Sequence, residues 1–432
     1  MIALVDCNSF FCSVEKVFHP GLKGRPVCVL SSNDGCIIAL TPEAKAIGLH
    51  RGDPVFKMRK IIEHNNVVLF SSNMNLYAAM SKRVNNILRS AVPHTETYSI
   101  DESFLYLDGF EQYYNLEDYM RSVVEKVRLY TDIPVSVGIA PSKTLAKIGS
   151  KYAKQYRGYR SVCLIDTEEK RRKALQHIKL SDVWGIGRQT LAKLNDFGIH
   201  TPLEFADRQE CWVNSHFHSP GIQTWKELNG IPCIDTPEVV QRQSICTSKS
   251  FSESVTDWDS LRASVANFAA GCANKLRGQH SVATTVTVFI MSNRFRKDLP
   301  QYSNSQTIVL PTPTSDTLEI TQAAIAALKE IYRENINYKK SGVILGNISD
   351  FSGIQLNLFD KIANRTNRLR LMQSIDELNH RFGLKKIRLA VEDSPSHSWH
   401  SKCEHRSGNY LSNLDEVLTI ENDIHESSIP LK

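Results

Sequence analysis

Two adjacent carboxylates, Asp101 and Glu102, stand in an otherwise apolar, strand-like run between Tyr98 and Asp108. Charged side chains in such a strand are costly unless something compensates them, and a divalent cation is a common compensator. A third carboxylate, Asp6, ends a short apolar run at the N-terminus, where a buried strand would bring it to the same sheet edge. Three carboxylates from two strands suit two hard cations, and such cations suit phosphoryl transfer.

A chain of 432 residues is too long for one ordinary hydrophobic core, so several domains are expected. Hydrophobic residues make up 41% and charged residues 23%, and no apolar run approaches the ~20 residues that cross a bilayer. The N-terminus lacks the basic region of a signal peptide, so none is expected. Ten cysteines are scattered without a CxxC pair, which favours reduced thiols in a cytoplasmic protein.

Basic residues concentrate between Ser142 and Lys193, where thirteen Lys or Arg stand against four Asp or Glu. The overall charge of +6 is modest, but this local excess fits a polyanion partner better than it fits a generally solvated surface. Ser142 can cap a helix over residues 143–155, and its four lysines, at 143, 147, 151 and 154, then form one stripe. The stripe would bind a ligand only if it lies over the carboxylate site, and a solvated helix face is the alternative.

Apolar periodicity predicts a mixed α/β region up to about residue 165, with strands over 2–5, 27–30, 37–40, 104–107 and 135–140 and helices over 76–88, 116–129 and 143–155. A helical segment follows from 167 to 230, and two prolines with a polar run suggest a linker near 235. A second, small α/β domain is predicted with helices over 261–276 and 318–332 and strands over 284–290, 307–310 and 343–348. One helix, 367–382, is predicted in the polar C-terminal part.

The run Trp184-Gly185-Ile186-Gly187-Arg188 resembles a helix-hairpin-helix. In that motif a Gly-hydrophobic-Gly turn presents backbone N–H groups at a helix N-terminus to a DNA phosphate. An ordinary helix turn with a glycine cap is the alternative. The basic surroundings and a second turn at Gly198 favour DNA binding through Gly185, Ile186, Gly187 and Arg188.

The segment Gln355-Leu356-Asn357-Leu358-Phe359 stands between the small domain and the polar tail. Its pattern resembles the peptide that replication factors insert into a sliding-clamp groove, with Gln355, Leu356, Leu358 and Phe359 as contacts. The alternative is that its apolar side chains pack back onto the small domain as a terminal strand.

Taken together, the motifs resemble those of the Y-family (translesion) DNA polymerases over residues 1 to about 350. The runs that carry this resemblance are Asp6-Cys7-Asn8-Ser9-Phe10-Phe11, Ser99-Ile100-Asp101-Glu102, Val137-Gly138-Ile139-Ala140, Lys143-Thr144-Leu145-Ala146-Lys147 and the turn Trp184-Gly185-Ile186-Gly187. Other runs resemble the UmuC-type branch, the catalytic subunit of bacterial DNA polymerase V: Ser31-Ser32-Asn33-Asp34-Gly35-Cys36, Phe70-Ser71-Ser72-Asn73, Val183-Trp184-Gly185-Ile186-Gly187 and Leu371-Met372-Gln373-Ser374-Ile375-Asp376-Glu377-Leu378-Asn379.

The resemblance implies an α/β multidomain, right-hand polymerase. Its expected parts are a palm (1–27 and 70–165), fingers (28–69), a helical thumb with the helix-hairpin-helix (166–232), a linker (233–242), an α/β little finger that binds DNA (243–350) and a C-terminal tail (351–432).

The resemblance also implies the roles of the carboxylates. Asp6 and Asp101 bridge two Mg²⁺ ions, Glu102 ligates the ion at the primer 3′-OH, and the Cys7 backbone carbonyl helps hold the nucleotide ion. Adjacent residues on an ideal strand point in opposite directions. Asp101 and Glu102 can therefore share one site only if Glu102 reaches round or the strand is bulged.

The implied nucleotide-binding residues are Phe10, Phe11, Lys45 and Lys154. Phe11 is the steric gate, whose ring would clash with a ribose 2′-OH, whereas Phe10 is expected to pack in the core. Lys154 matches a lysine that contacts the triphosphate. Many family members grip the triphosphate with a Tyr-x-Ala-Arg motif, but here Pro42 replaces the tyrosine and Lys45 the arginine, so the bidentate guanidinium is missing.

The implied function is error-prone translesion DNA synthesis in DNA repair and the SOS response. The implied partners are primer-template DNA, dNTPs, a sliding clamp, a UmuD-type accessory dimer and a recombinase filament, without a membrane. Two alternatives remain at this stage: a palm-domain nucleotide cyclase, which also uses paired carboxylates and two metals, and a catalytically inactive DNA-repair scaffold.

Overall fold

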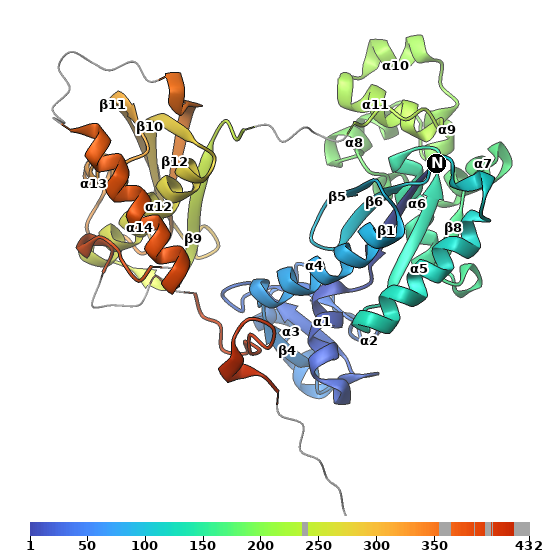
Figure 1. Ribbon diagram of the computed structural model, residues 1–432, viewed down its shortest axis with the longest axis horizontal. Coiled ribbons are helices and arrows are strands. Elements are labelled where there is room, and N and C mark those ends of the chain that lie inside the picture. The colour runs from blue at the N-terminus through green and yellow to red at the C-terminus, as the bar shows by residue number, and fades with distance from the viewer. Residues whose placement is uncertain (236–240, 354–363, 384, 394–398, 400, 419–432) are drawn as a thin grey trace, which may run out of the picture. The chain divides into compact units, whose positions relative to one another are not determined.

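The computed structural model describes residues 1–235, 241–353, 364–383, 385–393, 399 and 401–418 (Figure 1). The chain divides into two compact units, Met1–Pro237 with Cys403–Lys432, and Glu238–Lys402. The division falls inside the predicted linker. In the described parts of the chain, no helix combines the length and the apolar character needed to span a membrane.

The first unit is built on a five-stranded sheet, the main sheet, in the order β5-β6-β1-β7-β8. All neighbours pair antiparallel except β7 and β8. The strands are β1 (Ile2–Cys7), β5 (Thr95–Thr97), β6 (Glu102–Tyr106), β7 (Val135–Ala140) and β8 (Val162–Leu164). The surrounding helices are α1 (Phe10–Phe18), α4 (Met74–Ala91), α5 (Leu116–Thr131) and α6 (Lys143–Gln155), with short 3₁₀ turns η2 (Phe110–Gln112) and η3 (Arg157–Tyr159).

Alternation along β1 divides the core into two layers. Ala3 and Val5 belong to the cluster that includes α1, α4 and α5, whereas Ile2 and Leu4 belong to the cluster that includes α6. By the same period of two, Asp6 lies on the α6 side of the sheet. A carboxylate at the end of this strand is therefore delivered to the helix that carries the lysine stripe.

Helix α6 packs unusually close to β7 at Gly138. A Cβ at this position would overlap the Ala146 carbonyl and the Ser150 amide of the α6 backbone. Gly149, on the facing side of α6, is itself close to the Gly138 backbone. The pair of glycines therefore sets the short distance at which α6 lies over the sheet.

A smaller sheet in the same unit has the order β3-β2-β4. Its elements are η1 (Pro20–Leu22), β2 (Val27–Leu30), β3 (Ile37–Leu40), α2 (Pro42–Ala46), α3 (Val55–His64) and β4 (Val68–Ser71). Thr41 caps α2, because its hydroxyl accepts a hydrogen bond from the Ala44 amide. Pro42 occupies the first helical position, where no backbone N–H is needed.

A helical region completes the first unit, as predicted for residues 167–230. It contains α7 (Glu168–His177), η4 (Leu180–Asp182), α8 (Arg188–Asp196), α9 (Pro202–Ala206), α10 (Glu210–His216) and α11 (Ser219–Leu228).

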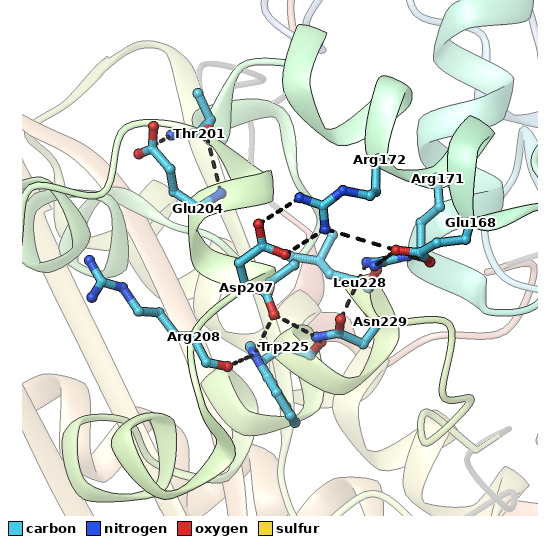
Figure 2. A network of polar contacts seen from close by, with 11 residues as sticks. Glu168, Arg171, Arg172, Thr201, Glu204, Asp207, Arg208, Trp225, Leu228 and Asn229 are labelled. Atoms are coloured by element: carbon cyan, nitrogen blue, oxygen red, sulfur yellow. Dashed lines mark hydrogen bonds and ion pairs between the residues drawn. The ribbon is translucent and has the colours of Figure 1, made fainter.

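Polar contacts link these short helices to one another (Figure 2). Arg172 on α7 donates two hydrogen bonds, of 2.8 and 2.9 Å, to the Asp207 carboxylate. Arg171 reaches α11 through the Leu228 carbonyl, at 2.9 Å. The Trp225 indole donates to the Arg208 carbonyl at 3.1 Å. Helices this short are not stable in isolation, and the buried hydrophobic cluster to which α7–α11 all contribute is what stabilises them here.

The second unit is a four-stranded antiparallel sheet in the order β11-β10-β12-β9 with two helices packed against it. Its elements are β9 (Ile245–Val255), α12 (Trp258–Gly278), β10 (Ser281–Ser292), β11 (Ser303–Thr314), α13 (Thr317–Ile331), β12 (Tyr338–Asp350) and η5 (Phe351–Gly353). The predicted second α/β domain is thus present, with longer strands than the apolar runs alone indicated.

The C-terminal part is shared between the two units. Helix α14 (Arg365–Phe382) belongs to the second unit, where its Asp376 pairs with Arg277 of α12 at 2.6 Å. The turns η6 (Ala390–Glu392) and η7 (Leu414–Glu416) follow. Residues 403–418 belong to the first unit, so the described parts of the region expected as one tail, 351–432, are divided between both units.

Candidate active site

The two strands that carry the predicted carboxylates are neighbours in the main sheet. Asp6 on β1 lies directly opposite Glu102 on β6 in the antiparallel register. Directly opposed residues have Cβ atoms about 5 Å apart on the same face. The Cys7 amide then donates to the Asp101 carbonyl at 2.9 Å, which places Asp101 beside the end of β1.

Asp101 does not lie in the strand, because β6 begins at Glu102. Residues 98–101 form the turn between β5 and β6, and Ser99 organises it. The Ser99 hydroxyl donates to Asp101 Oδ1 at 2.6 Å and accepts from the Glu102 amide at 3.1 Å. This turn removes the difficulty that adjacent strand residues point in opposite directions, so neither a bulge nor a long reach by Glu102 is required.

Helix α6 begins and ends as predicted, and the Ser142 hydroxyl caps it by accepting from the Leu145 amide. Two of its four lysines lie at the carboxylates. Lys154 Nζ is 2.8 Å from Asp6 Oδ1, and Lys147 Nζ is 2.8 Å from Glu102 Oε1. The α6 stripe thus lies over the carboxylate site in part.

The other two lysines of the stripe have structural partners. Lys143 is buried and pairs with Glu96 at 2.7 Å, and Lys151 pairs with Asp182 at 2.6 Å. All four lysines of α6 are therefore paired with carboxylates, and the helix does not offer a polyanion four free lysines.

The carboxylates line a cavity of about 690 Å³ in the first unit. The predicted residues that line it are Asp6, Cys7, Phe10, Phe11, Lys45, Asp101, Glu102 and Lys154. Residues from the first strand, the β5–β6 turn, α6 and the region around α2 thus meet at one place, as the resemblance implied.

Burial raises the pKa of the Cys7 thiol, and the charges of Asp6 and Asp101 raise it further. The Cys7 side chain packs in the hydrophobic cluster with Ala3 and Val5, on the face of the sheet opposite to Asp6, so the backbone carbonyl of Cys7 is the group available for the predicted role.

The wall of the cavity at the first residues of α1 is aromatic. Phe10 is 3% exposed and belongs to the hydrophobic core, as expected, while also touching the cavity. Phe11 is half-buried, and its ring stacks on Tyr77 of α4 with centroids 4.5 Å apart and planes 15° apart. Tyr77 was not identified from the sequence, because α4 shows only an ordinary amphipathic pattern.

Two further cavity residues, His50 and Arg51, were also not identified from the sequence. Both are exposed and follow α2. The sequence did hold one signal for Arg51: Lys45 stands where many family members have an arginine, so another guanidinium nearby could be expected to take its place. Arg51, six residues further on, supplies one in the same cavity.

The helix-hairpin-helix run has the expected turn geometry. Gly185 has φ +94°, and a Cβ there would overlap the Thr224 hydroxyl, so a side chain is excluded on both counts. Gly187 is the N-cap of α8, and Ile186 is buried. Trp184 packs against Tyr98 with ring centroids 5.4 Å apart. This contact links the turn at Gly185 to the β5–β6 turn that carries Asp101.

The side chains around the cavity bear on whether a metal ion can bind there. Among the described residues, no group of three or more His, Cys, Asp or Glu side chains is gathered closely enough to hold a metal. Lysines neutralise Asp6 and Glu102 instead. The donor chemistry still fits Mg²⁺, since the site offers hard carboxylate oxygens from adjacent chain segments. The predicted clamp contacts, Gln355, Leu356, Leu358 and Phe359, lie outside the described residues.

Three family models match the chain. The impB/mucB/samB family matches residues 5–151, its C-terminal domain matches 242–358, and a domain of unknown function (DUF4113) matches 369–420.

Relatives match over nearly the whole length. UmuC of Salmonella typhimurium is 40% identical over 423 residues, which cover 98% of this chain and 100% of that protein. ImpB of Salmonella typhimurium is 40% identical over 88% of this chain and 90% of its own length. DNA polymerase IV of Bacillus velezensis is 24% identical, over 89% of this chain and 91% of its own length.

Solved structures share the fold. A Y-family DNA polymerase chimera of Dbh and Dpo4 has a TM-score of 0.62 at 22% identity, covering 81% of this chain and 100% of that chain. An insertion ternary complex of Dbh DNA polymerase has a TM-score of 0.53 at 21% identity, with coverage of 81% and 100%.

The fold and these matches define a Y-family polymerase with the right-hand α/β architecture, a DNA-directed DNA polymerase. Within that class the chain belongs to the impB/mucB/samB family. It is similar to UmuC over the full length of that protein. The expected class is confirmed, and both the nucleotide cyclase and the non-enzymatic scaffold are set aside.

Proposed function

We propose that this polymerase adds dNTPs to a primer 3′-OH opposite damaged template bases, with low fidelity, by phosphoryl transfer assisted by two Mg²⁺ ions. The observation that carries the proposal is the register that sets Asp6 opposite Glu102, with Asp101 in the adjoining turn, at one cavity. Y-family polymerases generally use divalent metal ions. When bound, such ions neutralise the charge that develops on the transferring phosphoryl group and activate the attacking hydroxyl.

The chain's own residues divide the remaining work. Asp6, Asp101, Glu102 and the Cys7 carbonyl would hold the ions. Binding requires Lys154 and Lys147 to release their carboxylates. Lys154, a side chain 39% exposed, is then free to pair with the triphosphate, together with Lys45 and Arg51.

The assignment of parts follows the elements. The main sheet with α1, α4, α5 and α6 is assigned to the palm, and the smaller sheet with α2 and α3 to the fingers. The helical region is the thumb, and the second unit through β12 is the little finger. Gly185, Ile186, Gly187 and Arg188 would contact DNA phosphates without reading sequence.

The same resemblance supports further partners as proposals. A sliding clamp would bind residues 355–359, and a UmuD-type accessory dimer and a recombinase filament would assemble with the polymerase. A cytoplasmic location accords with these partners.

The test of the proposed reaction is primer extension on intact and abasic templates, with Mg²⁺ and then with excess EDTA. Extension across both templates in Mg²⁺, and none in EDTA, is expected. Extension that persists in EDTA would contradict the metal-assisted mechanism. Extension of the intact template alone would contradict the translesion role.

A further inference from the structure

The C-terminal segment, residues 403–418, lies against the smaller sheet and α1 in the first unit (Figure 1). Its backbone pairs with Ser71 at the end of β4. The Ser71 amide donates to the His405 carbonyl at 2.9 Å, and the His405 amide donates to the Ser71 hydroxyl at 2.9 Å. The segment is therefore docked by directional hydrogen bonds and is part of this fold.

The segment also forms hydrogen bonds with the N-cap residue of α4. Asn73 is the N-cap of this helix, where its side-chain oxygen accepts from the Leu76 amide. The amide nitrogen of the same buried side chain donates to the Ser407 carbonyl at 3.0 Å and to the Gly408 carbonyl at 3.2 Å. One side chain thus ties the position of α4 to the segment.

A buried carboxylate links the segment to α1. The Ser407 hydroxyl donates to Glu15 Oε1 at 3.0 Å, and the Tyr77 hydroxyl donates to the same oxygen at 2.6 Å. Glu15 and Tyr77 are both fully buried. Glu15 Oε2 is buried as well, and no hydrogen-bond partner for it lies among the described residues. The two hydroxyl groups are therefore what holds this carboxyl group in place.

The same arrangement reaches the cavity. Glu15 lies one helical turn after Phe11 on α1, so both face Tyr77. The Tyr77 ring stacks on Phe11 while its hydroxyl binds Glu15. A continuous path of contacts runs from Ser407 through Glu15 and Tyr77 to the wall of the nucleotide cavity.

We propose that Ser407 of the C-terminal segment is a positioning residue for sugar selection, acting through Glu15 and Tyr77 to hold the Phe11 ring. The inference rests on the proposed function of Phe11 as the steric gate. It also gives a role to part of the region matched only by the domain of unknown function. A gate that works by shape rejects a 2′-OH only if its ring cannot tilt aside, so its support determines its selectivity.

The test compares the kcat/KM ratio of dCTP to CTP for single insertions opposite template G. A smaller fraction of folded protein lowers the apparent kcat/KM for dCTP and for CTP by the same factor, so this effect cancels in their ratio. Phe11→Ala should lower the ratio most. Ser407→Ala and Tyr77→Phe should each lower it by roughly threefold to tenfold, the effect of losing one buried hydrogen bond.

Three variants serve as controls. Ser412→Ala makes the same chemical change in an exposed part of the segment and should leave the ratio unchanged. Glu15→Gln keeps an oxygen acceptor for both hydroxyls and should also keep the ratio. In a Tyr77→Phe background, Ser407→Ala should have no further effect, since the path is already broken.

Binding provides a readout that does not depend on turnover. The ratio of the Kd of CTP to that of dCTP, measured on a dideoxy-terminated primer-template complex, should fall in the same variants.

The outcomes separate the two levels of the proposal. If Phe11→Ala leaves both ratios unchanged, the proposed steric gate is wrong. If Phe11→Ala lowers them and Ser407→Ala behaves like Ser412→Ala, the gate stands and the role of Ser407 is wrong. An effect of Ser407→Ala that persists in the Tyr77→Phe background would also overturn the proposed path.

Discussion

At the scale of single residues, two carboxylate–lysine pairs and one hydroxyl hydrogen bond, from Ser99 to Asp101, explain how three acidic side chains coexist beside a cavity. The side chains of Asp6, Glu102, Lys147 and Lys154 are between 18% and 39% exposed. Ion pairs that water can reach contribute little to folding stability. Lys154, at 39% the most exposed of these four side chains, can therefore leave Asp6 at small cost when a divalent cation takes its place.

Gly138 is the residue on which the close packing of α6 most depends. Gly138→Ala should destabilise the protein by more than the roughly 1–3 kcal/mol of ordinary overpacking, because the added methyl group meets backbone that cannot rotate away. A thermal melt measures this. Gly158→Ala is the matched control, since nothing lies within 4 Å of its Cβ position. Equal melting temperatures for the two variants would contradict the close contact.

At the scale of elements, local signals predicted the site's framework well. Ser142 marked the start of α6, and the apolar runs at 27–30, 37–40 and 135–140 coincide with strands. The β5–β6 turn was not predicted, because it depends on a Ser99 side chain whose role appears only once the hairpin forms. The stacking of Tyr77 on Phe11 and the docking of residues 403–418 were also not predicted from the sequence, because both contacts join residues far apart in the chain.

Helix α1 carries a testable pH dependence. Burial raises the pKa of Glu15 above its ordinary value of 4.5, against the lowering effect of hydrogen bonds from Tyr77 and Ser407 and of the nearby His19. Above pH 4.5 the unfolded chain releases this proton while the folded chain retains it, so stability falls as pH rises. Glu15→Gln does not titrate and should therefore gain melting temperature relative to wild type from pH 4.5 towards neutrality.

The control for this trend is a carboxyl group shifted the other way. Hydrogen bonding from the His200 amide lowers the pKa of Glu204, so Glu204→Gln should lose melting temperature relative to wild type over the pH range in which that carboxyl ionises. Parallel trends for both variants would contradict the assignment to Glu15.

At the scale of the whole molecule, the C-terminal region contributes one part to each unit. Helix α14 is held on the second unit by Asp376, and the segment from Cys403 is held on the first by Asn73 and Ser71. The sequence indicated a polar tail because the apolar contacts of this region come from isolated side chains, such as the buried Met372 of α14 and Tyr410, whose ring lies 5.0 Å from that of Phe18. Composition is informative about apolar cores, and it is a weak guide to a segment docked by hydrogen bonds.

The proposed binding of a sliding clamp is tested at this scale. Replacing Leu358 and Phe359 by alanine should weaken binding to a sliding clamp and spare synthesis on a short, clamp-free primer. Apolar anchors in such grooves contribute roughly 1.5–3 kcal/mol each when fully buried. A pull-down with the clamp, run beside a thermal melt, measures both properties. Retained clamp binding with a lowered melting temperature would instead indicate a strand packed on the second unit.

Asp101→Asn tests the proposed metal-binding carboxylates themselves. The change keeps the volume of the side chain and removes the charge that the metal ions require. Nucleotide addition should be abolished, while primer-template affinity, which arises from phosphate contacts and falls steeply with salt, should persist. Asp108→Asn, at the end of the same run and 79% exposed, should retain full activity. Primer extension by Asp101→Asn at the wild-type rate would contradict the assignment of this carboxylate site.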